Sequence, residues 1–188
     1  MNHLTDQEII NSVKRGNAAD FSLLIDRYKD KAFSMLRRML KNSLDAEEAL
    51  QDAFLKAFYR LNNFHGDSQF STWLYKITYN CALSMIASKK RKIELEMTSI
   101  DEHFELGNFD NEIYSTSENA NDFIYKMIDK LPIRNAIVLI LFYIDGLSLN
   151  EISSVLDTSL VNTKVLLHRS RIALRNLLLR HNYLPEKR

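Results

Sequence analysis

Residues 45–92 decide the fold, and they read DAEEALQDAFLKAFYRL (45–61), NNFHGDSQF (62–70) and STWLYKITYNCALSMIASKKRK (71–92). In the first segment, apolar residues recur every third or fourth position from Ala46 to Leu61, which is helical spacing. Asp45 and Glu48 have the spacing of a capping box. We therefore expect a helix that begins after Asp45 as N-cap and runs to about Arg60.

The next two segments predict a polar loop and a second helix. Gly66 stands among Asn, Asp and Ser residues, which is typical of a loop. The following helix carries Trp73 and Tyr75 near its start and ends in the basic run 89–92. An acid-tipped helix, a polar loop and a helix that turns basic suit a protein that contacts a partner at one end and nucleic acid at the other.

This stretch resembles the second conserved region of sigma factors of the extracytoplasmic-function (ECF) group, in the sigma-70 family. The order of residue types over some forty positions carries the resemblance, because no single residue would. The matching residues are Asp45, Ala46, Glu47, Glu48, Gln51, Asp52, Phe54, Leu61, Phe64, Gly66, Phe70, Thr72, Trp73, Leu74, Ile77 and Asn80.

Composition predicts an all-α protein of two small helical domains. A chain of 188 residues holds one medium or two small domains, and 46% hydrophobic residues suffice to build cores. Four Gly and two Pro argue against a turn-rich β protein. The net charge is only +1, but residues 93–120 contain acids and no Lys or Arg. We expect domains at 1–92 and 121–188, joined by an acidic linker at 93–120.

Several classes of protein are excluded or disfavoured. Cys81 is the only cysteine, so a disulfide framework and a thiolate metal cage are excluded, and we expect it to be a small buried hydrophobic residue. No signal peptide and no transmembrane segment are apparent, which indicates a soluble cytoplasmic protein. We find no catalytic motif and expect no enzyme activity, no cofactor and no metal site.

Local signals place the other helices of the first domain. Thr5 and Glu8 form a second capping-box pattern, which predicts a short helix to Val13. A longer helix is expected over 18–40 because its apolar residues form one stripe. The basic residues on its other faces, such as Lys29 and Arg38, suit a solvated surface or a DNA-facing one.

The second half predicts a helix-turn-helix. Helices are expected over 121–130, from the first turn at Pro132 to about 144, from the Ser148/Glu151 capping box to 156, and over 160–179. A short helix, a tight turn and a longer basic helix are typical of a DNA-reading unit, although a plain helical bundle with a charged face has the same pattern. Two apolar stripes compete for the buried side of the last helix, and we favour Thr163/Leu167/Ser170/Leu174 over Val161/Val165/Ile172.

This half is similar to the fourth region of ECF sigma factors. The matching residues are Leu131, Pro132, Gly146, Leu147, Ser148, Glu151, Ile152, Leu167, His168, Arg169, Ser170, Arg171, Leu174 and Arg175. The resemblance implies binding to the −35 promoter element, and implies that the first domain binds core RNA polymerase and the −10 element.

The candidate site residues fall into three groups. The resemblance assigns contact with the clamp coiled coil of the largest polymerase subunit to Asp45, Glu48, Gln51 and Asp52. The loop of polar groups beside aromatic residues could receive an unstacked base, and the basic run could neutralise phosphates. The −10 candidates are Asn62, Asn63, Phe64, His65, Gly66, Asp67, Lys76, Tyr79, Asn80, Lys89, Lys90, Arg91 and Lys92. The −35 candidates are Asn162, Lys164, His168 and Arg169, since Asn can pair with adenine.

Alternatives remain open for individual residues. Phe64 and Trp73 are aromatic and can serve as core anchors instead of base-stacking groups. The family commonly has Asp and Arg where this chain has Ser84 and Ala87, and often Arg at Leu166, which bears on its DNA preference.

The sequence as a whole indicates an ECF-type sigma factor. We expect it to bind promoters tightly only together with polymerase, because the promoter affinity of two weak DNA-binding modules on a flexible linker depends on their effective concentration. An anti-sigma partner is expected from the family. The rival hypotheses are a stand-alone helix-turn-helix regulator and a sigma-like interaction module without DNA binding.

Overall fold

The computed structural model describes residues 4–97 and 120–181, and every regular element in these ranges is helical, which confirms the all-α prediction. The chain divides into two compact units, the first ending at Phe109 and the second beginning at Asp110. The predicted linker at 93–120 lies mostly outside the described residues. Its first residues, however, are helical, because the fourth helix runs to Met97 rather than ending at 92.

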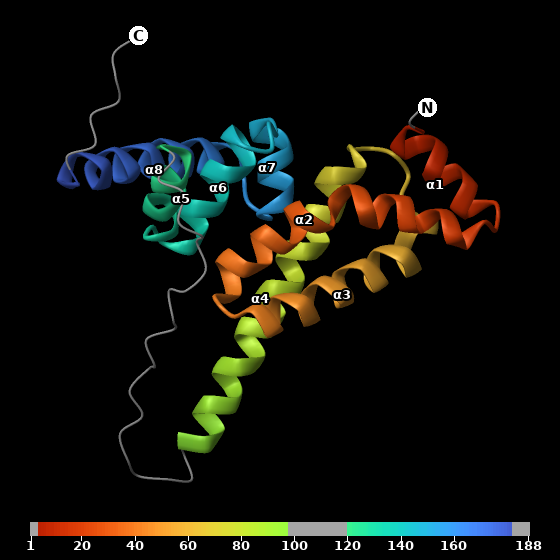
Figure 1. Ribbon diagram of the computed structural model, residues 1–188, viewed down its shortest axis with the longest axis horizontal. Coiled ribbons are helices and arrows are strands. Elements are labelled where there is room, and N and C mark those ends of the chain that lie inside the picture. The colour runs from red at the N-terminus through yellow and green to blue at the C-terminus, as the bar shows by residue number, and fades with distance from the viewer. Residues whose placement is uncertain (1–3, 98–119, 182–188) are drawn as a thin grey trace. The chain divides into compact units, whose positions relative to one another are not determined.

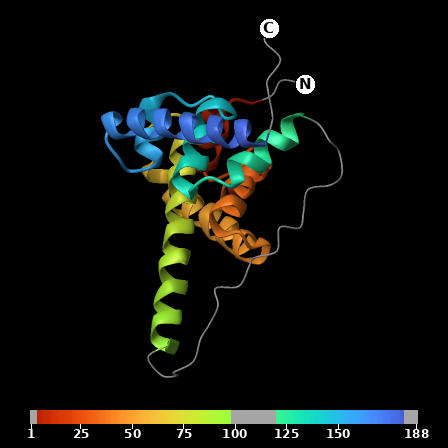
Figure 2. The ribbon, with the colours of Figure 1, turned by 90° about the vertical axis from the view of Figure 1, so that its left-hand side faces the viewer.

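The first unit is built from α1 to α4 (Figure 1). The helices are α1 (Asp6–Lys14), α2 (Phe21–Leu40), α3 (Ser43–Arg60) and α4 (Phe70–Met97), with 3-10 turns at Ala18–Asp20 and Leu61–Asn63. The helices α2, α3 and α4 pack on one another around residues such as Leu24, Phe54 and Leu74. The C-terminal part of α4 runs out of this bundle in both ribbon views (Figures 1 and 2). The basic run 89–92 lies on that projecting part.

The capping pattern is confirmed at α1 and wrong at α3. Thr5 accepts a hydrogen bond from the backbone of Glu8, and the Glu8 carboxylate accepts one from the backbone of Thr5. At α3 the N-cap is Asn42, not Asp45, because Asn42 has extended backbone and its Oδ1 accepts from the Asp45 backbone N–H at 3.0 Å. Asp45 therefore lies inside the first turn, and its carboxylate is available for another partner.

The second unit holds α5 (Ala120–Asp129), α6 (Ile133–Tyr143), α7 (Leu149–Val155) and α8 (Leu160–Arg180). The capping box of Ser148 and Glu151 is confirmed. Pro132 is the N-cap of α6 rather than its first residue. The turn before α7 needs a glycine, because Gly146 has a φ of +71°. Helix α7, the turn and α8 make the predicted helix-turn-helix.

The orientation of α8 follows the favoured apolar stripe. Thr163, Leu167 and Ser170 are buried, whereas Val161 is 69% exposed. The hydroxyls of Thr163 and Ser170 are accommodated because each donates to a backbone carbonyl one turn earlier, at 3.0 and 2.7 Å. Many residues on the remaining sides of α8 are exposed.

Cys81 is buried, as expected, and should be chemically inert in the folded chain. Burial raises the pKa of its thiol, and the Lys56 ammonium at 3.6 Å lowers that pKa only in part. We expect Cys81 to react with a disulfide reagent at pH 7.5 about 100-fold more slowly in the native chain than in denaturant, because reaction must wait for local opening. The absorbance of the released aromatic thiol measures this; equal rates in the two states would show that Cys81 is accessible.

Candidate polymerase and nucleic-acid interface

The outward face of α3 carries the candidate polymerase contacts. Glu48, Gln51 and Asp52 are exposed there, whereas the Asp45 side chain retains only 17% exposure. The structure adds a feature that the sequence analysis missed: Leu44, Leu55 and Tyr59 are 75, 55 and 76% exposed on the same side of the helix. The spacing of Leu44, Glu48, Gln51 and Leu55 could have revealed this face. Large exposed apolar groups with polar groups around them are typical of a protein-binding surface.

Asp45 and Lys89 join two candidate groups. The Lys89 ammonium on α4 forms an ion pair and hydrogen bond with the Asp45 carboxylate on α3. The first residue was predicted to contact polymerase and the second to contact DNA. The contact fixes the start of the projecting part of α4 against the N-terminal turn of α3. Asp52 makes a separate ion pair with Lys56 at 2.6 Å within α3.

The loop after α3 exposes its polar side chains and hides its aromatic one. Asn62, Asn63, His65 and Asp67 are exposed. Phe64 is 5% exposed and packs against Phe70 and Trp73, with ring centroids 5.8 and 5.2 Å away. Gly66 has a φ of +84°, a conformation that favours glycine. Phe64 is thus a core anchor in this state, which was one of its two interpretations.

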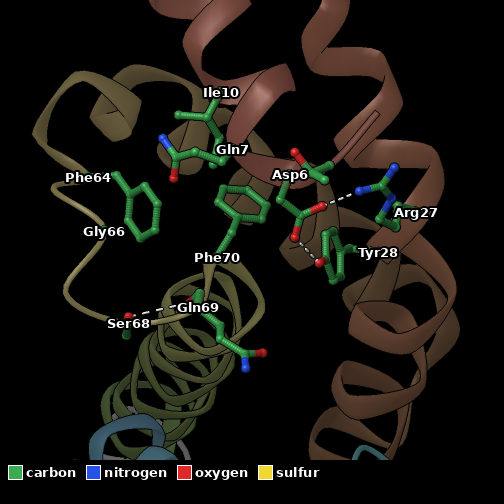
Figure 3. Close-up of a pocket in the computed structure, with 11 residues that line it drawn as sticks. Asp6, Gln7, Ile10, Arg27, Tyr28, Phe64, Gly66, Ser68, Gln69 and Phe70 are labelled. Carbon is green, nitrogen blue, oxygen red and sulfur yellow. Dashed lines mark hydrogen bonds and ion pairs between the residues drawn. The ribbon is translucent and has the colours of Figure 1, made fainter. Parts of the chain in front are cut away.

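A cavity of about 450 Å³ lies between α1, α2 and this loop (Figure 3). Phe64 and Phe70 border the pocket but are only 5 and 3% exposed, and the amide side chains of Gln7 and Gln69 contribute donors and acceptors. The lining residues are Thr5, Asp6, Gln7, Ile10, Arg27, Tyr28, Phe64, Gly66, Ser68, Gln69 and Phe70. Most of these residues are polar and the pocket is open to solvent, so its lining differs from the mainly apolar lining of a typical small-ligand site.

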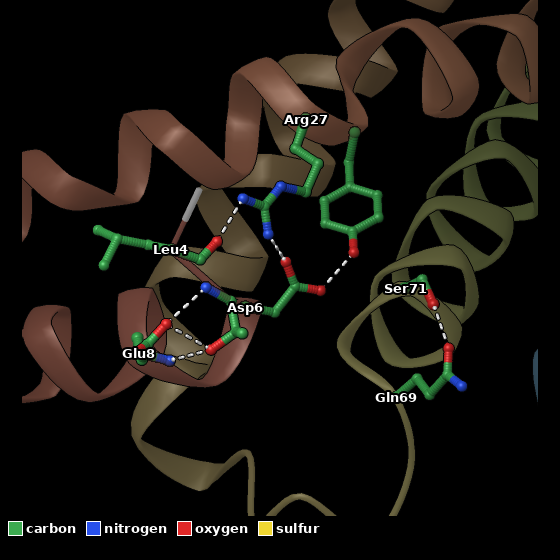
Figure 4. A network of polar contacts seen from close by, with 8 residues as sticks. Leu4, Asp6, Glu8, Arg27, Gln69 and Ser71 are labelled. Atoms are coloured by element: carbon green, nitrogen blue, oxygen red, sulfur yellow. Dashed lines mark hydrogen bonds and ion pairs between the residues drawn. The ribbon is translucent and has the colours of Figure 1, made fainter. Parts of the chain in front are cut away.

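Helix α1 is held as one wall of this cavity by polar contacts (Figure 4). The Asp6 carboxylate accepts hydrogen bonds from the Arg27 guanidinium and the Tyr28 hydroxyl, and Arg27 also donates to the Leu4 carbonyl at 2.7 Å. Burial, and then the bond to Asp6, raises the pKa of Tyr28, so its hydroxyl stays a donor at neutral pH. Lys14 donates to the Phe64 carbonyl at 2.6 Å and so ties α1 to the loop.

The candidates on α4 are not all on its surface. Asn80 and the residues of the run 89–92 are exposed, and Lys76 is half-buried. Tyr79 is 3% exposed, so the structure does not present this −10 candidate at the surface. A direct contact of Tyr79 with DNA would require repacking of the bundle.

The candidates on α8 are all accessible. Asn162, Lys164, His168 and Arg169 are exposed, with Asn162 in the first turn, where its backbone N–H donates to the N-cap Ser159 at 3.2 Å. Val161 and Val165 are exposed beside them and were not among the predicted contacts. Exposed apolar groups at the start of such a helix can contact the methyl group of thymine.

Comparison with known families matches both units. Residues 24–92 match the family model of Sigma-70 region 2, and residues 124–174 match that of Sigma-70 region 4. The chain is 33% identical over 180 residues to the ECF RNA polymerase sigma-E factor of Escherichia coli K12, covering 92% of this chain and 94% of that protein. The chain belongs to the ECF group of the sigma-70 family.

A second relative agrees with this membership, and two solved structures share the fold. The ECF sigma factor SigW of Bacillus subtilis 168 is 34% identical over 177 residues, covering 90% of this chain and 94% of SigW. The fold resembles the sigma factor RpoE of Bartonella quintana, solved with NepR, with a TM-score of 0.66 and 20% identity over 85% of this chain and 96% of that one. It also resembles CnrH, solved with the cytosolic domain of CnrY, with a TM-score of 0.64 and 22% identity over 92% and 96%.

An ECF sigma factor directs core RNA polymerase to specific promoters and initiates DNA opening there. Such a factor is an initiation factor and not itself an enzyme. The family membership favours this function over a stand-alone regulator and over an interaction module without DNA binding. Within the described residues, no helix combines the length and apolar character needed to cross a bilayer.

Proposed function

We propose that this sigma factor divides its task among three surfaces. The outward face of α3 binds the polymerase clamp, the loop at 62–69 with α4 holds the −10 element, and the N-terminal half of α8 holds the −35 element. One observation supports this proposal. The first unit exposes an acidic and apolar face on α3 and a basic run on α4, and an ion pair between Asp45 and Lys89 links these two surfaces. One compact unit can therefore engage polymerase and DNA together.

The −10 surface acts by trapping one base. Removing a base from the stack costs a few kcal/mol unless a site receives it. The pocket of about 450 Å³ beside the loop offers hydrogen-bonding groups from Gln7 and Gln69, with the buried Phe70 at its wall. The exposed Asn62, Asn63, His65 and Asp67 guide the strand toward it. Lys89–Lys92 neutralise phosphates without reading sequence.

The −35 surface acts by direct reading. Asn162 pairs with adenine, and Lys164, His168 and Arg169 contact base edges or phosphates along the same helix. Polymerase performs all bond-making chemistry, and the sigma factor itself catalyses nothing. The site of action is the cytoplasm, where polymerase and promoters are.

An anti-sigma factor controls access to these surfaces. RpoE and CnrH were each solved with a protein partner, NepR named as an anti-sigma factor and CnrY. A partner of this kind should block association with core polymerase. A purified candidate that leaves polymerase binding unchanged is not that partner.

Transcription in vitro tests the proposed function. Purified chain, core bacterial polymerase and genomic DNA should yield transcripts from a small set of starts that core polymerase alone does not use. Mapping those starts defines the −10 and −35 sequences. Absence of chain-dependent starts would refute the proposal.

The hydrogen bond from Lys14 on α1 to the Phe64 carbonyl, a tether between α1 and the loop, should affect both the stability of the fold and promoter opening. Lys14→Met removes the donor to the Phe64 carbonyl, so we expect a loss of about 1 kcal/mol in the free energy of unfolding. Promoter opening should slow several-fold because the loop is less fixed. Denaturant titration and an open-complex assay measure the two effects. Lys29→Met, which breaks only an exposed ion pair with Asp26, is the control. Equal behaviour of the two variants would show that the tether has no role.

A further inference from the structure

Arg171 on α8 is held by two aromatic rings of α6. Its guanidinium carbon lies 5.4 Å from the ring centroid of Phe142 and 5.4 Å from that of Tyr143. The two rings are edge to face, with centroids 5.0 Å apart. A guanidinium at this distance from a ring is attracted by the ring's electron-rich face. Among the residues that the structure describes, Arg171 is therefore restrained by rings and not by a carboxylate.

In the part of the chain that the structure describes, the hydrogen-bonding capacity of this guanidinium is unused. Within residues 4–97 and 120–181, Arg171 makes contacts with the two rings and has no hydrogen bond or ion pair. A guanidinium carries five N–H donors. Tyr143 is 57% exposed, so the aromatic support is at the surface and open to a ligand. A restrained cation with unused donors at the surface is suited to an anion.

Arg171 also belongs to a longer basic stripe. Lys164, His168, Arg171 and Arg175 are all exposed and follow one another at helical spacing, so they lie along one side of α8. The range 160–180 contains no Asp or Glu. From Lys164 to Arg175 the helix rises roughly 16 Å, a length that covers several phosphates of a DNA strand. The stripe begins among the predicted −35 contacts and continues beyond them.

We propose that Arg171 binds a phosphate of promoter DNA and that Phe142 and Tyr143 hold it in position for that contact. This inference rests on the proposed −35 function of α8 and adds a contact outside its predicted set. Because the ligand is a phosphate, Arg171 contributes affinity and register but no base preference. The rings restrict the side chain before binding, so less freedom is lost when the contact forms.

The test compares variants of the full chain bound to core polymerase, on promoter duplex and on the same duplex with a scrambled −35 element. Arg171→Ala should weaken binding about eightfold at 0.1 M salt on both duplexes and reduce the slope of log affinity against log salt by about 0.9. Arg180→Ala removes an equal charge from another side of α8 and is the matched control. It should change neither quantity.

Tyr143→Leu tests the aromatic support. It keeps an apolar side chain, so the unit should remain folded, and the affinity loss should be smaller than that of Arg171→Ala with the salt slope retained. Thermal unfolding of each variant shows whether Arg171 acts in DNA binding or only stabilises the packing of α8 against α6. The inference would be overturned if Arg171→Ala and Arg180→Ala had the same DNA affinity and the same salt slope. It would also be overturned if Arg171→Ala lowered thermal stability and left DNA binding unchanged. If the unaltered holoenzyme does not prefer the promoter duplex, the proposed function itself fails.

Discussion

Replacing Lys89, Lys90, Arg91 and Lys92 together by Gln should reduce promoter opening by about 10²- to 10³-fold at 0.1 M salt. This loss corresponds to three to four phosphate contacts, each of which adds about 0.7 to 0.9 to the slope of log affinity against log salt concentration. These residues are exposed on α4, so the substitutions should leave the core intact, although Lys89→Gln also removes the ion pair with Asp45 on α3. Permanganate footprinting of unpaired thymines, repeated at several salt concentrations, measures the effect.

A control of equal charge distinguishes this surface from general attraction to DNA. Arg15, Lys29, Lys31 and Lys41 lie in the same unit and are exposed, and their joint replacement by Gln lowers the net charge by the same amount. The control should change opening less than fivefold, roughly the effect of distant charges screened at this salt concentration. Equal losses in both variants would mean that only the overall charge matters and that the basic run is not a DNA surface.

Leu55→Asp should weaken association with core polymerase by about 30-fold or more, the effect of losing one central apolar contact of roughly 2 kcal/mol. Leu55 is 55% exposed in the middle of the outward face of α3, between Gln51 and Tyr59. The substitution places a carboxylate at a position that would lose its water when polymerase binds. Fluorescence titration of labelled chain with core polymerase gives the dissociation constant.

Leu23→Asp is the matched control for this experiment. Leu23 is 42% exposed on α2, and the proposed polymerase surface does not include it. Its variant should bind polymerase like the unaltered chain. If both variants bind normally while folding normally, α3 does not carry the polymerase contact.

Elements with local signals were predictable from the sequence. The capping boxes at Thr5 and Ser148 depend on groups three residues apart, and the buried side of α8 follows from one stripe of residues. The prediction failed at Asp45 because Asn42, three residues earlier, is also a strong N-cap. It also ended α4 too early, since the acidic residues after 92 continue the helix without an apolar stripe.

The site was less predictable because its contacts join distant residues. Asp6 accepts hydrogen bonds from Arg27 and Tyr28, and Lys14 donates one to the Phe64 carbonyl. These partners are far apart in the sequence, so the spacing of apolar residues does not predict their contacts. For the same reason the sequence placed Tyr79 among the −10 contacts, although packing against α2 and α3 decides which side of α4 is buried. The predicted polymerase and DNA contacts themselves remain predictions for the experiments above.

The central claim is that this sigma factor holds a promoter well only after polymerase has bound it. The direct measurement is the affinity of the full chain for a mapped promoter duplex, with and without saturating core polymerase, at one salt concentration. We expect the free chain to bind promoter and scrambled DNA alike and weakly, and polymerase to raise promoter affinity by at least about 100-fold, within the range of linked binding modules. Tight, promoter-specific binding by the free chain would contradict it.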